Sequence, residues 1–326
     1  MNLFNPLVPL LIPSFSSKGN LFILNEEGQY ISDNYDLPQA LDIRISKSYL
    51  LSAYDIYYGF MPREPSDWPY TEHLFIDSGG YETNDSFDLS ERNKYNYKVL
   101  PWDYKKMETV YERIVACPKF ENSNIILSAF DGKGAFKQQL YAALDLKKDF
   151  PTAFTNFIIK IDFGIDDLLK ELKQHREQLT QFSILGFTEK ELGLSLRERL
   201  LNIIDIRQQL DECGWNGYVH IFGGLEPNFV KLFYYAGADI FDGLSWQRTR
   251  YWNNSTLFTP EKYIVSSSEF ENKYLMMLDN LAYMQEISNT LSTIAGKRTE
   301  YAITLKKLLR KKSCICIQDL LRELEV

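Results

Sequence analysis

The sequence predicts an α/β fold of the (β/α)8 TIM barrel type. From about Tyr70 onward, short and nearly continuous apolar runs alternate with segments of helical periodicity. This alternation is typical of parallel strands that helices cover on both faces. No Gly-x-Gly-x-x-Gly motif follows any of the apolar runs, which disfavours a dinucleotide-binding fold. The repeated strand and helix units, preceded by a β-rich segment, therefore fit a barrel better than a two-domain arrangement.

The individual elements follow from the apolar runs and from helix-capping signals. Ser195 and Glu198 have the spacing of a capping box. Pro227 suits a first helical turn, and Gly237 suits the end of the same helix. The predicted strands are 74–76, 124–130, 157–161, 183–187, 218–222 and 239–241. The predicted helices are 102–115, 137–147, 166–178, 196–210 and 228–235.

The two ends of the chain differ from the repeating middle. Residues 1–60 are expected to form an antiparallel, β-rich segment, with a hairpin between Leu21–Leu24 and Tyr30-Ile31. Residues 263–326 have helical periodicity and are expected to pack on the barrel or to complete its last units. We therefore expect a barrel domain over 1–262 and a helical C-terminal segment after it.

Composition and charge restrict the class of protein. The net charge is −8, so contact with nucleic acid would need a local basic patch. The strongest candidate is Lys306–Lys312, which is either a solvated helix face or a phosphate-binding surface. No apolar run is long enough for a membrane span, and Met1–Phe15 lacks the charged start of a signal peptide. With only four scattered cysteines, a cytoplasmic protein with reduced thiols and no membrane partner is expected.

Acidic residues follow the apolar cores of several predicted strands. The strand ends read Ile76-Asp77, Phe130-Asp131, Ile161-Asp162 and Phe241-Asp242. One aspartate in such a place is commonly a turn or a helix cap. Barrel enzymes, however, gather their catalytic groups at the C-terminal ends of the strands, so a shared site is the better interpretation of the set. Paired carboxylates could act in glycoside-type displacement or bind a metal through oxygen.

The stretch HLFIDSGGYET, from His73 to Thr83, suggests room for a ligand beside one of these acids. Gly79 and Gly80 free the backbone for positive φ and let another molecule approach. Histidine is scarce, and only His220 lies on a predicted barrel strand, where a hydrogen-bonded core residue is the alternative interpretation. A Ser-His-Asp hydrolase is therefore disfavoured.

Three motifs, taken in order, resemble the tRNA-guanine transglycosylase family. FIDSGGYE resembles its aspartate–Ser-Gly-Gly–aromatic motif, and AGADIFDGLSWQR resembles its nucleophile strand. LSAFDGKG lies where the family keeps its base-recognising aspartate. The order and spacing match from about Pro9 to Arg250, roughly three quarters of the chain. The resemblance implies a barrel enzyme of the pentosyltransferase class.

The resemblance also implies roles for individual residues. Asp242 would be the nucleophile that attacks C1′ of a target guanosine, Asp77 the general base, and Asp131 the acceptor for the guanine-like edge of the base. A carboxylate can form a covalent glycosyl intermediate and can accept hydrogen bonds from purine N–H groups. Tyr81 would stack on the base, with ordinary packing as the alternative. The expected substrate-binding set is completed by Ser78, Gly79, His220, Gly223 and Gly224.

The chain departs from the tRNA enzymes at three places. SCICIQD supplies Cys314 and Cys316 without a third cysteine or a later histidine, so the structural zinc of that family is not expected, and no other cofactor is implied. The family's glycine-leucine loop after Ile184 is replaced by LGFTEKELGLSLRERL. One strand later, HIFGGLEP replaces the family's usual glycine-rich segment. These variants resemble the DNA-modifying branch of the family, which inserts 7-deazaguanine bases into DNA.

The expected function is therefore exchange of guanine for a 7-deazaguanine base, with DNA preferred over tRNA. A tRNA-guanine transglycosylase, an N-glycosidase and a non-catalytic nucleic-acid-binding subunit remain as alternatives. A duplex substrate would have to extrude its target nucleotide, a step in which an ATPase partner could take part. Arg248 and Arg250 would clamp flanking phosphates. The basic residues expected to contact the polymer backbone are Lys306, Lys307, Arg310 and Lys311.

Overall fold

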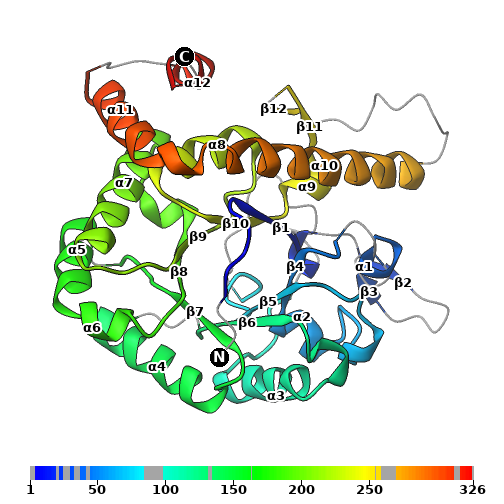
Figure 1. The fold of residues 1–326 in the computed structure, drawn as a ribbon. Helices are drawn as coiled ribbons and strands as arrows, with labels where there is room; N and C mark the ends of the chain where they lie inside the picture. Colours follow the sequence, from blue (N-terminus) through cyan, green and yellow to red (C-terminus); the bar gives the residue numbers. More distant parts are fainter. Residues whose placement is uncertain are drawn as a thin grey trace. The chain divides into compact units, whose positions relative to one another are not determined.

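The computed structural model describes residues 4–19, 22–24, 30–32, 37–41, 45–83, 98–130, 134–162, 164–253, 255–257, 269–311 and 316–324. Its strands form a closed barrel of eight, in the order β1-β10-β9-β8-β7-β6-β5-β4 (Figure 1). The pairs are parallel, as between β4 and β5 or β9 and β10, and helices flank the strands. The predicted (β/α)8 class is confirmed. The barrel strands are β1 (Leu10–Phe15), β4 (Ser48–Ser52), β5 (His73–Asp77), β6 (Asn124–Ser128), β7 (Phe154–Ile158), β8 (Ile184–Thr188), β9 (Tyr218–Phe222) and β10 (Ile240–Gly243).

The N-terminal segment differs from the antiparallel arrangement expected for residues 1–60. It supplies two barrel strands, β1 and β4, which pair with each other in parallel. All six residues of β1 are buried, with Pro13 among them. A proline inside an apolar run argues against a central strand on sequence grounds, which is why the run was not recognised as part of the barrel. The predicted hairpin is confirmed, because β2 (Phe22–Leu24) pairs in antiparallel fashion with β3 (Tyr30–Ser32), and antiparallel pairing among the described residues of this segment is confined to these two strands.

Strand β7 begins three residues earlier than the predicted 157–161 run. It includes Thr155 and Asn156, which are polar but 5% and 0% exposed. Because these two buried residues are polar, the apolar pattern marks only the end of this strand. As a result, Asp162 lies four residues beyond the end of β7, not next to it.

The helices agree closely with their capping signals. Ser195 accepts a hydrogen bond from the backbone N–H of Glu198, and the reciprocal half of the capping box is also present. The predicted 166–178 helix is broken at His175 into two. The helices are α1 (Leu37–Ala40), α2 (Ala53–Tyr58), α3 (Tyr104–Val115), α4 (Phe136–Asp149), α5 (Ile165–Gln174), α6 (Arg176–Leu179), α7 (Leu196–Glu212), α8 (Pro227–Ala236), α9 (Ser245–Arg248), α10 (Glu269–Ser292), α11 (Arg298–Lys311) and α12 (Ile317–Leu324).

The chain divides into two compact units. The C-terminal unit comprises Met1–Leu11, Lys133–Gln139 and Ile158–Val326, and the N-terminal unit comprises Ile12–Gly132 and Leu140–Phe157. Each unit has a core to which both strand and helix residues contribute. The helices after residue 268 belong to the same unit as β8, β9 and β10.

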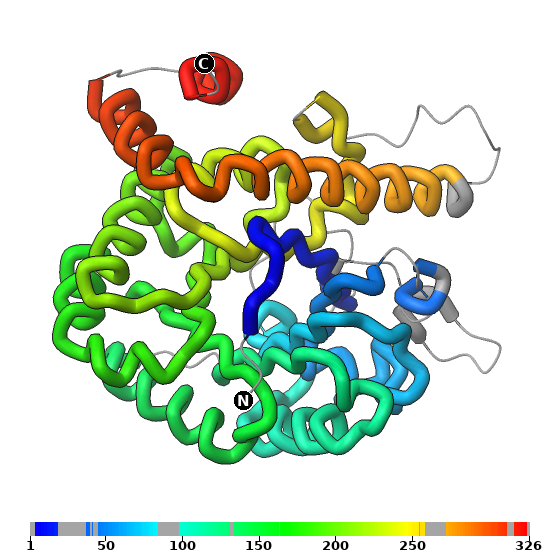
Figure 2. Tube along the Cα trace, in the orientation of Figure 1, coloured from blue at the N-terminus to red at the C-terminus, as the bar shows by residue number. Residues whose placement is uncertain are grey.

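Within the C-terminal unit, the long helix α10 packs against α8, and α11 packs against both α7 and α8. Figure 2 shows α10 in orange alongside the yellow-green α8, with the chain then turning into α11. The side chains of Met276, Met277 and Leu281 on α10 are buried. No helix of the described residues, α10 included, has the length and apolar character that a membrane crossing needs.

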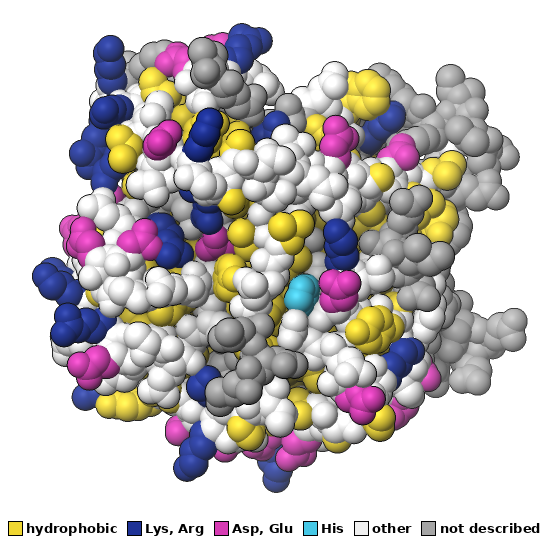
Figure 3. Space-filling view, viewed as in Figure 1, with side chains coloured by type: hydrophobic (Ala, Val, Ile, Leu, Met, Phe, Trp, Pro, Cys, Tyr) yellow, Lys and Arg dark blue, Asp and Glu magenta, His cyan; other side chains and the backbone are white. Residues whose placement is uncertain are grey.

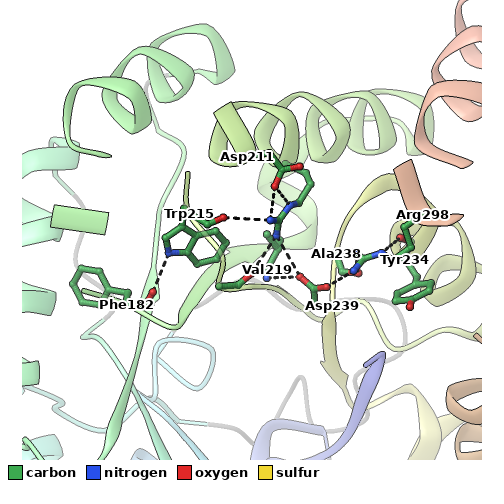
Figure 4. Close-up of polar contacts among 10 residues, drawn as sticks. Phe182, Asp211, Trp215, Val219, Tyr234, Ala238, Asp239 and Arg298 are labelled. Atoms are coloured by element: carbon green, nitrogen blue, oxygen red, sulfur yellow. Dashed lines mark hydrogen bonds and ion pairs between the residues drawn. The ribbon is translucent and has the colours of Figure 1, made fainter. Parts of the chain in front are cut away.

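Asp239, which precedes β10, fastens α11 to the strands of the C-terminal unit (Figure 4). Its Oδ1 accepts a hydrogen bond from Arg298 Nη1 at 2.5 Å, and its Oδ2 accepts one from the backbone N–H of Val219 at 2.9 Å. Arg207 lies on the other side, with Nη1 3.8 Å from Oδ2. The Arg298 guanidinium also lies 4.4 Å from the ring centre of Tyr234. These contacts are at the start of β10, the side of a barrel where side chains serve stability more than chemistry.

Candidate active site

Asp77 is the last residue of β5 and is half-buried. Its Oδ2 accepts a hydrogen bond from the backbone N–H of Gly79 at 3.1 Å, which closes a tight turn after the strand. Gly79 has φ +89°, and a Cβ added there would lie 2.7 Å from Cβ of Tyr54. A glycine is therefore required at this position by backbone conformation and by close packing. This turn gives Asp77 a defined orientation at the end of its strand.

Ser78, the middle residue of this turn, is almost fully buried and contacts Trp102. The indole Nε1 of Trp102 donates a hydrogen bond to the Ser78 carbonyl at 2.8 Å. The Ser78 hydroxyl has no hydrogen-bond partner among the residues that the structure describes. Buried hydroxyl groups normally have a partner, so this oxygen marks a place where a ligand could complete the hydrogen bonding.

Tyr81 follows the two glycines and is 36% exposed. The Nζ of Lys18 donates to the Tyr81 carbonyl at 3.2 Å and lies 4.8 Å from the centre of its ring. Burial and the negative charge of Asp77 raise the pKa of the Tyr111 hydroxyl well above its usual range. Tyr111 donates a hydrogen bond to the carbonyl of Ser128 at 2.8 Å, so it is a fixed neutral neighbour of the Asp77 turn.

Asp242 lies on β10 in the C-terminal unit and is 6% exposed. Its Oδ1 accepts hydrogen bonds from Nε2 of His220 and from the backbone N–H of Gly223, each at 3.2 Å. Gly223 has φ +79°, a conformation that favours glycine and turns its N–H toward the carboxylate. Gly224, which follows, packs closely, because a Cβ there would lie 3.0 Å from Cγ2 of Ile221.

His220, expected among the substrate-binding residues, is fully buried and contacts Asp242 directly. Its ring also stacks on Phe222, with ring centres 4.0 Å apart. The imidazole therefore has a carboxylate on one side and an aromatic face on another. This arrangement suits a residue that orients Asp242.

A hydrogen-bonded brace holds the segment that follows Asp242. The amide of Asn280, which is fully buried on α10, accepts from the N–H of Tyr251 at 2.8 Å and donates to the carbonyls of Trp246 and Thr249 at 2.7 Å each. The Tyr251 hydroxyl lies 2.7 Å from the hydroxyl of Ser245. Nothing in the sequence marked Asn280 for this role, because its partners are backbone groups about 30 residues away.

The two arginines expected to clamp phosphates follow this brace. Arg248 ends α9 and Arg250 begins β11 (Arg250–Trp252), and both are half-buried. The Arg250 guanidinium lies 4.9 Å from the ring centre of Trp252, whose exposed fraction is 51%. β11 pairs in antiparallel fashion with β12 (Ser255–Leu257). An arginine beside an exposed indole is a combination that also occurs at single-stranded nucleic-acid sites.

Further charged residues of the C-terminal unit, which are not among the predicted site residues, lie after β7 and β8. Lys160 Nζ lies 3.1 Å from Oε1 of Glu191 and donates to the Thr188 hydroxyl at 3.1 Å. Glu189 forms an ion pair with Arg199. The sequence signal for this group is the run of charged residues in TEKE, Thr188–Glu191.

Glu226, which precedes α8, has its pKa raised, first by burial and then by the charge of Glu189. The sequence around Glu226, with Pro227 after it, does not indicate a carboxyl group with a shifted pKa. The pKa shift marks Glu226 as a carboxyl that could carry a proton closer to neutrality than an ordinary glutamate does.

The basic run lies mainly on α11. Lys306 is bound to α7 of the C-terminal unit, because its Nζ donates a hydrogen bond to Oδ1 of Asp205 at 2.6 Å. Lys307, Arg310 and Lys311 are exposed, and Figure 3 shows Lys and Arg side chains along the edge where α11 lies. Lys312 lies outside the described residues. The exposed members are thus available for a polyanion.

Two groups of predicted residues are each brought together within one unit. Asp77, Ser78 and Gly79 share one turn, and Asp242 contacts His220 and Gly223. Asp131 lies outside the described residues, as does Cys314. In the described part of the chain, no three His, Cys, Asp or Glu side chains are grouped so that they could hold a metal ion.

Comparisons with known proteins add no relative. The chain matches no family model, and no curated protein shows significant similarity to it.

Proposed function

We propose that this protein is a guanine transglycosylase of nucleic acids, which exchanges guanine for a 7-deazaguanine base through a covalent aspartyl-glycosyl intermediate. The observation that carries the proposal is the setting of Asp242: a nearly buried carboxylate at the end of a barrel strand, oriented by His220 and by the N–H of Gly223. Barrel enzymes hold their nucleophiles at such strand ends. The ordered motifs FIDSGGYE, LSAFDGKG and AGADIFDGLSWQR supply the family resemblance.

In the first step, a carboxylate oxygen of Asp242 attacks C1′ of the target guanosine. A C1′–O bond forms as the C1′–N9 bond breaks, and the electron pair of the broken bond leaves with guanine, which takes up a proton from water. The transition state resembles an oxocarbenium ion, and negative charge nearby stabilises it. A carboxylate held by two donors has its plane fixed before the reaction, so little reorganisation is needed.

In the second step, Asp77 accepts the N–H proton of the incoming base. The freed nitrogen attacks C1′ and displaces the carboxylate of Asp242, and Asp77 returns its proton to water. The buried hydroxyl of Ser78, which lacks a partner among the described residues, would hydrogen-bond the polar edge of this base. Asp131 keeps the role of guanine recognition that the resemblance implies.

DNA is the preferred polymer in this proposal. The preference rests on the replaced glycine-leucine loop after Ile184. Exposed Lys307, Arg310 and Lys311 on α11 would contact the phosphate backbone of either polymer. A duplex target would be extruded before attack, and an ATPase partner that opens the duplex is compatible with this requirement.

The direct test is incubation of the protein with DNA and, separately, with tRNA, each with isotope-labelled guanine, followed by mass spectrometry of the nucleosides. We expect label in deoxyguanosine from DNA and none with Asp242→Asn. Label in tRNA alone would reassign the polymer. Abasic sites without label would indicate an N-glycosidase, in which water resolves the intermediate. Neither label nor abasic sites in either polymer would refute the enzymatic proposal and leave a binding subunit.

A further inference from the structure

A buried charged cluster of the N-terminal unit has no part in the proposed reaction. Its members are Lys18, Asp55 and Glu82, which are 0%, 0% and 2% exposed. They come from the turn after β1, from α2 and from the turn after β5. Burying a charge is costly unless it is paired and hydrogen-bonded. The contacts of the cluster therefore indicate what it holds in place.

Glu82 ties the end of the Asp77 turn to two strands. Its Oε1 accepts a hydrogen bond from the Ser16 hydroxyl at 2.5 Å, and its Oε2 accepts one from the Ser52 hydroxyl at 2.7 Å. Ser16 directly follows β1, and Ser52 is the last residue of β4. Ser52 is also the Cα partner of Asp77 in the β4–β5 ladder. The carboxylate of Glu82 thus reaches the strand position beside Asp77.

Lys18 and Asp55 complete the anchoring. Lys18 Nζ donates to the carbonyl of Tyr81, the residue before Glu82, at 3.2 Å. Asp55 accepts hydrogen bonds from the backbone N–H of Ser17, at 2.7 Å, and from the Ser17 hydroxyl. Asp55 therefore fixes the short segment that carries Lys18, and Lys18 in turn holds the Asp77 turn.

The charges of the cluster balance when one of the two acids is protonated. Burial, followed by the charge of Glu82, raises the pKa of Asp55 well above its usual range, and Asp77 adds a smaller effect in the same direction. Burial also raises the pKa of Glu82, while the serine hydrogen bonds and Lys18 oppose that rise. Because the charge of Glu82 raises the pKa of Asp55, the two acids ionise in separate steps. With Asp55 protonated, the charges of Glu82 and Lys18 cancel, and the cluster has no net charge.

The turn from Asp77 to Glu82 is consequently held at both ends. At its start, Gly79 donates to Asp77 and Trp102 donates to the Ser78 carbonyl. At its end, it is held through Glu82 and the Tyr81 carbonyl. We infer that Lys18, Asp55 and Glu82 are positioning residues, which fix the turn so that Asp77 and Ser78 present their oxygens in one orientation. The catalytic part of this inference rests on the role proposed for Asp77.

The first test measures the turn itself and needs no activity. Amide hydrogen exchange of residues 78–83 is compared among the parent, Glu82→Ala, Glu82→Gln and Thr71→Val. Glutamine keeps an acceptor for one serine and a donor for the other. Thr71 is a fully buried control just before β5, with a hydrogen bond to the Ile45 carbonyl. We expect about tenfold faster exchange in Glu82→Ala, a near-parental rate in Glu82→Gln and no local change in Thr71→Val.

The second test uses base exchange in the same variants. Glu82→Ala should raise KM for the incoming base about tenfold with a smaller loss in kcat. In Glu82→Gln, both KM and kcat should lie close to the parental values. Unchanged amide exchange of the turn in a folded Glu82→Ala would overturn the inference. So would parallel losses of activity in Glu82→Ala and Thr71→Val, which would reduce Glu82 to a general stabiliser. If the turn loosens in Glu82→Ala as expected but the parent exchanges no base, the proposed function is refuted and the positioning of the turn stands.

Discussion

The Nε2 of His220 lies 3.2 Å from Oδ1 of Asp242, and both residues are buried. An ionised carboxylate only accepts hydrogen bonds, so the imidazole is the donor. The N–H of Gly223 donates to the same oxygen at 3.2 Å. The two donors fix the plane of the carboxylate group, which is the property that a nucleophile attacking one carbon atom needs.

Replacement of His220 should therefore slow formation of the covalent adduct. We expect His220→Ala to reduce the rate about tenfold to a hundredfold, the effect of removing one orienting hydrogen bond to a charged group. His220→Gln, which retains a donor, should lie closer to the parent. Adduct formation is measured by denaturing electrophoresis of protein mixed with DNA, at matched folded fraction. A parental rate in folded His220→Ala would make His220 a core residue only.

Asp242 itself carries the strongest prediction. Asp242→Ala and Asp242→Asn should both abolish the adduct, because neither side chain offers a nucleophilic oxygen. Asp242→Asn should leave polymer binding within about twofold of the parent, since the amide nearly matches the carboxylate in shape. Binding is measured by fluorescence anisotropy of labelled DNA. Base exchange by either variant at the parental rate would show that another group is the nucleophile.

The glycines of the two turns should respond differently to alanine. Gly79→Ala combines φ +89° with a Cβ placed 2.7 Å from Cβ of Tyr54, whereas Gly223→Ala at φ +79° meets no atom within 4 Å. We expect Gly79→Ala to lower the free energy of unfolding by more than about 2 kcal/mol, and Gly223→Ala by about 1 kcal/mol. Urea unfolding measures both. Equal destabilisation of the two variants would mean that backbone strain alone, without the clash against Tyr54, accounts for the requirement for glycine at position 79.

The sequence was sufficient for those parts of the fold in which apolar periodicity and capping coincide. The strands that lead to Asp77 and Asp242 were found because their cores are continuous apolar runs, and the helix after Ser195 because both halves of its capping box are local. β1 was missed because Pro13 interrupts its pattern, and β7 was placed too late because Thr155 and Asn156 are buried polar residues.

The side-chain contacts of the site depend on strand register, and parallel strands pair only after a long crossover connection, so their partners are not neighbours in the sequence. His220 pairs with Ile240 across β9 and β10, and Asp242, two residues after Ile240, lies on the same face of β10. Likewise, Glu82 was visible as an acid after two glycines, but its hydrogen bonds to Ser16 and Ser52 join segments 66 and 30 residues apart. Buried charges of this kind follow from tertiary packing, so sequence reasoning could name Glu82 and not its role.

Replacement of Arg298 should destabilise the C-terminal unit, because it leaves the nearly buried Asp239 with only part of its compensation. We expect Arg298→Met to lower the free energy of unfolding by about 2–4 kcal/mol. Lys170→Met is the matched control, since the Lys170–Asp167 pair is 75% and 60% exposed, and exposed ion pairs contribute little to stability. Urea unfolding of both variants gives the comparison, and a destabilisation no larger than the control's would show that Arg207 alone compensates Asp239.

Charge reversal on α11 should weaken binding to nucleic acid and flatten its salt dependence. Lys307, Arg310 and Lys311 are exposed, and removal of each phosphate-binding charge should reduce the slope of log K against log salt by about 0.9 for duplex DNA. The triple change to Glu is therefore expected to lower that slope by about 2–3. The control is the triple change to Glu at exposed Lys105, Lys148 and Lys173. This control alters the net charge equally and should leave the slope of log K against log salt nearly unchanged. Anisotropy titrations from low to moderate salt measure both sets. Equal slopes in the two triple variants would identify the α11 run as a solvated helix face, because binding of the phosphate backbone requires the local charges and not the net charge.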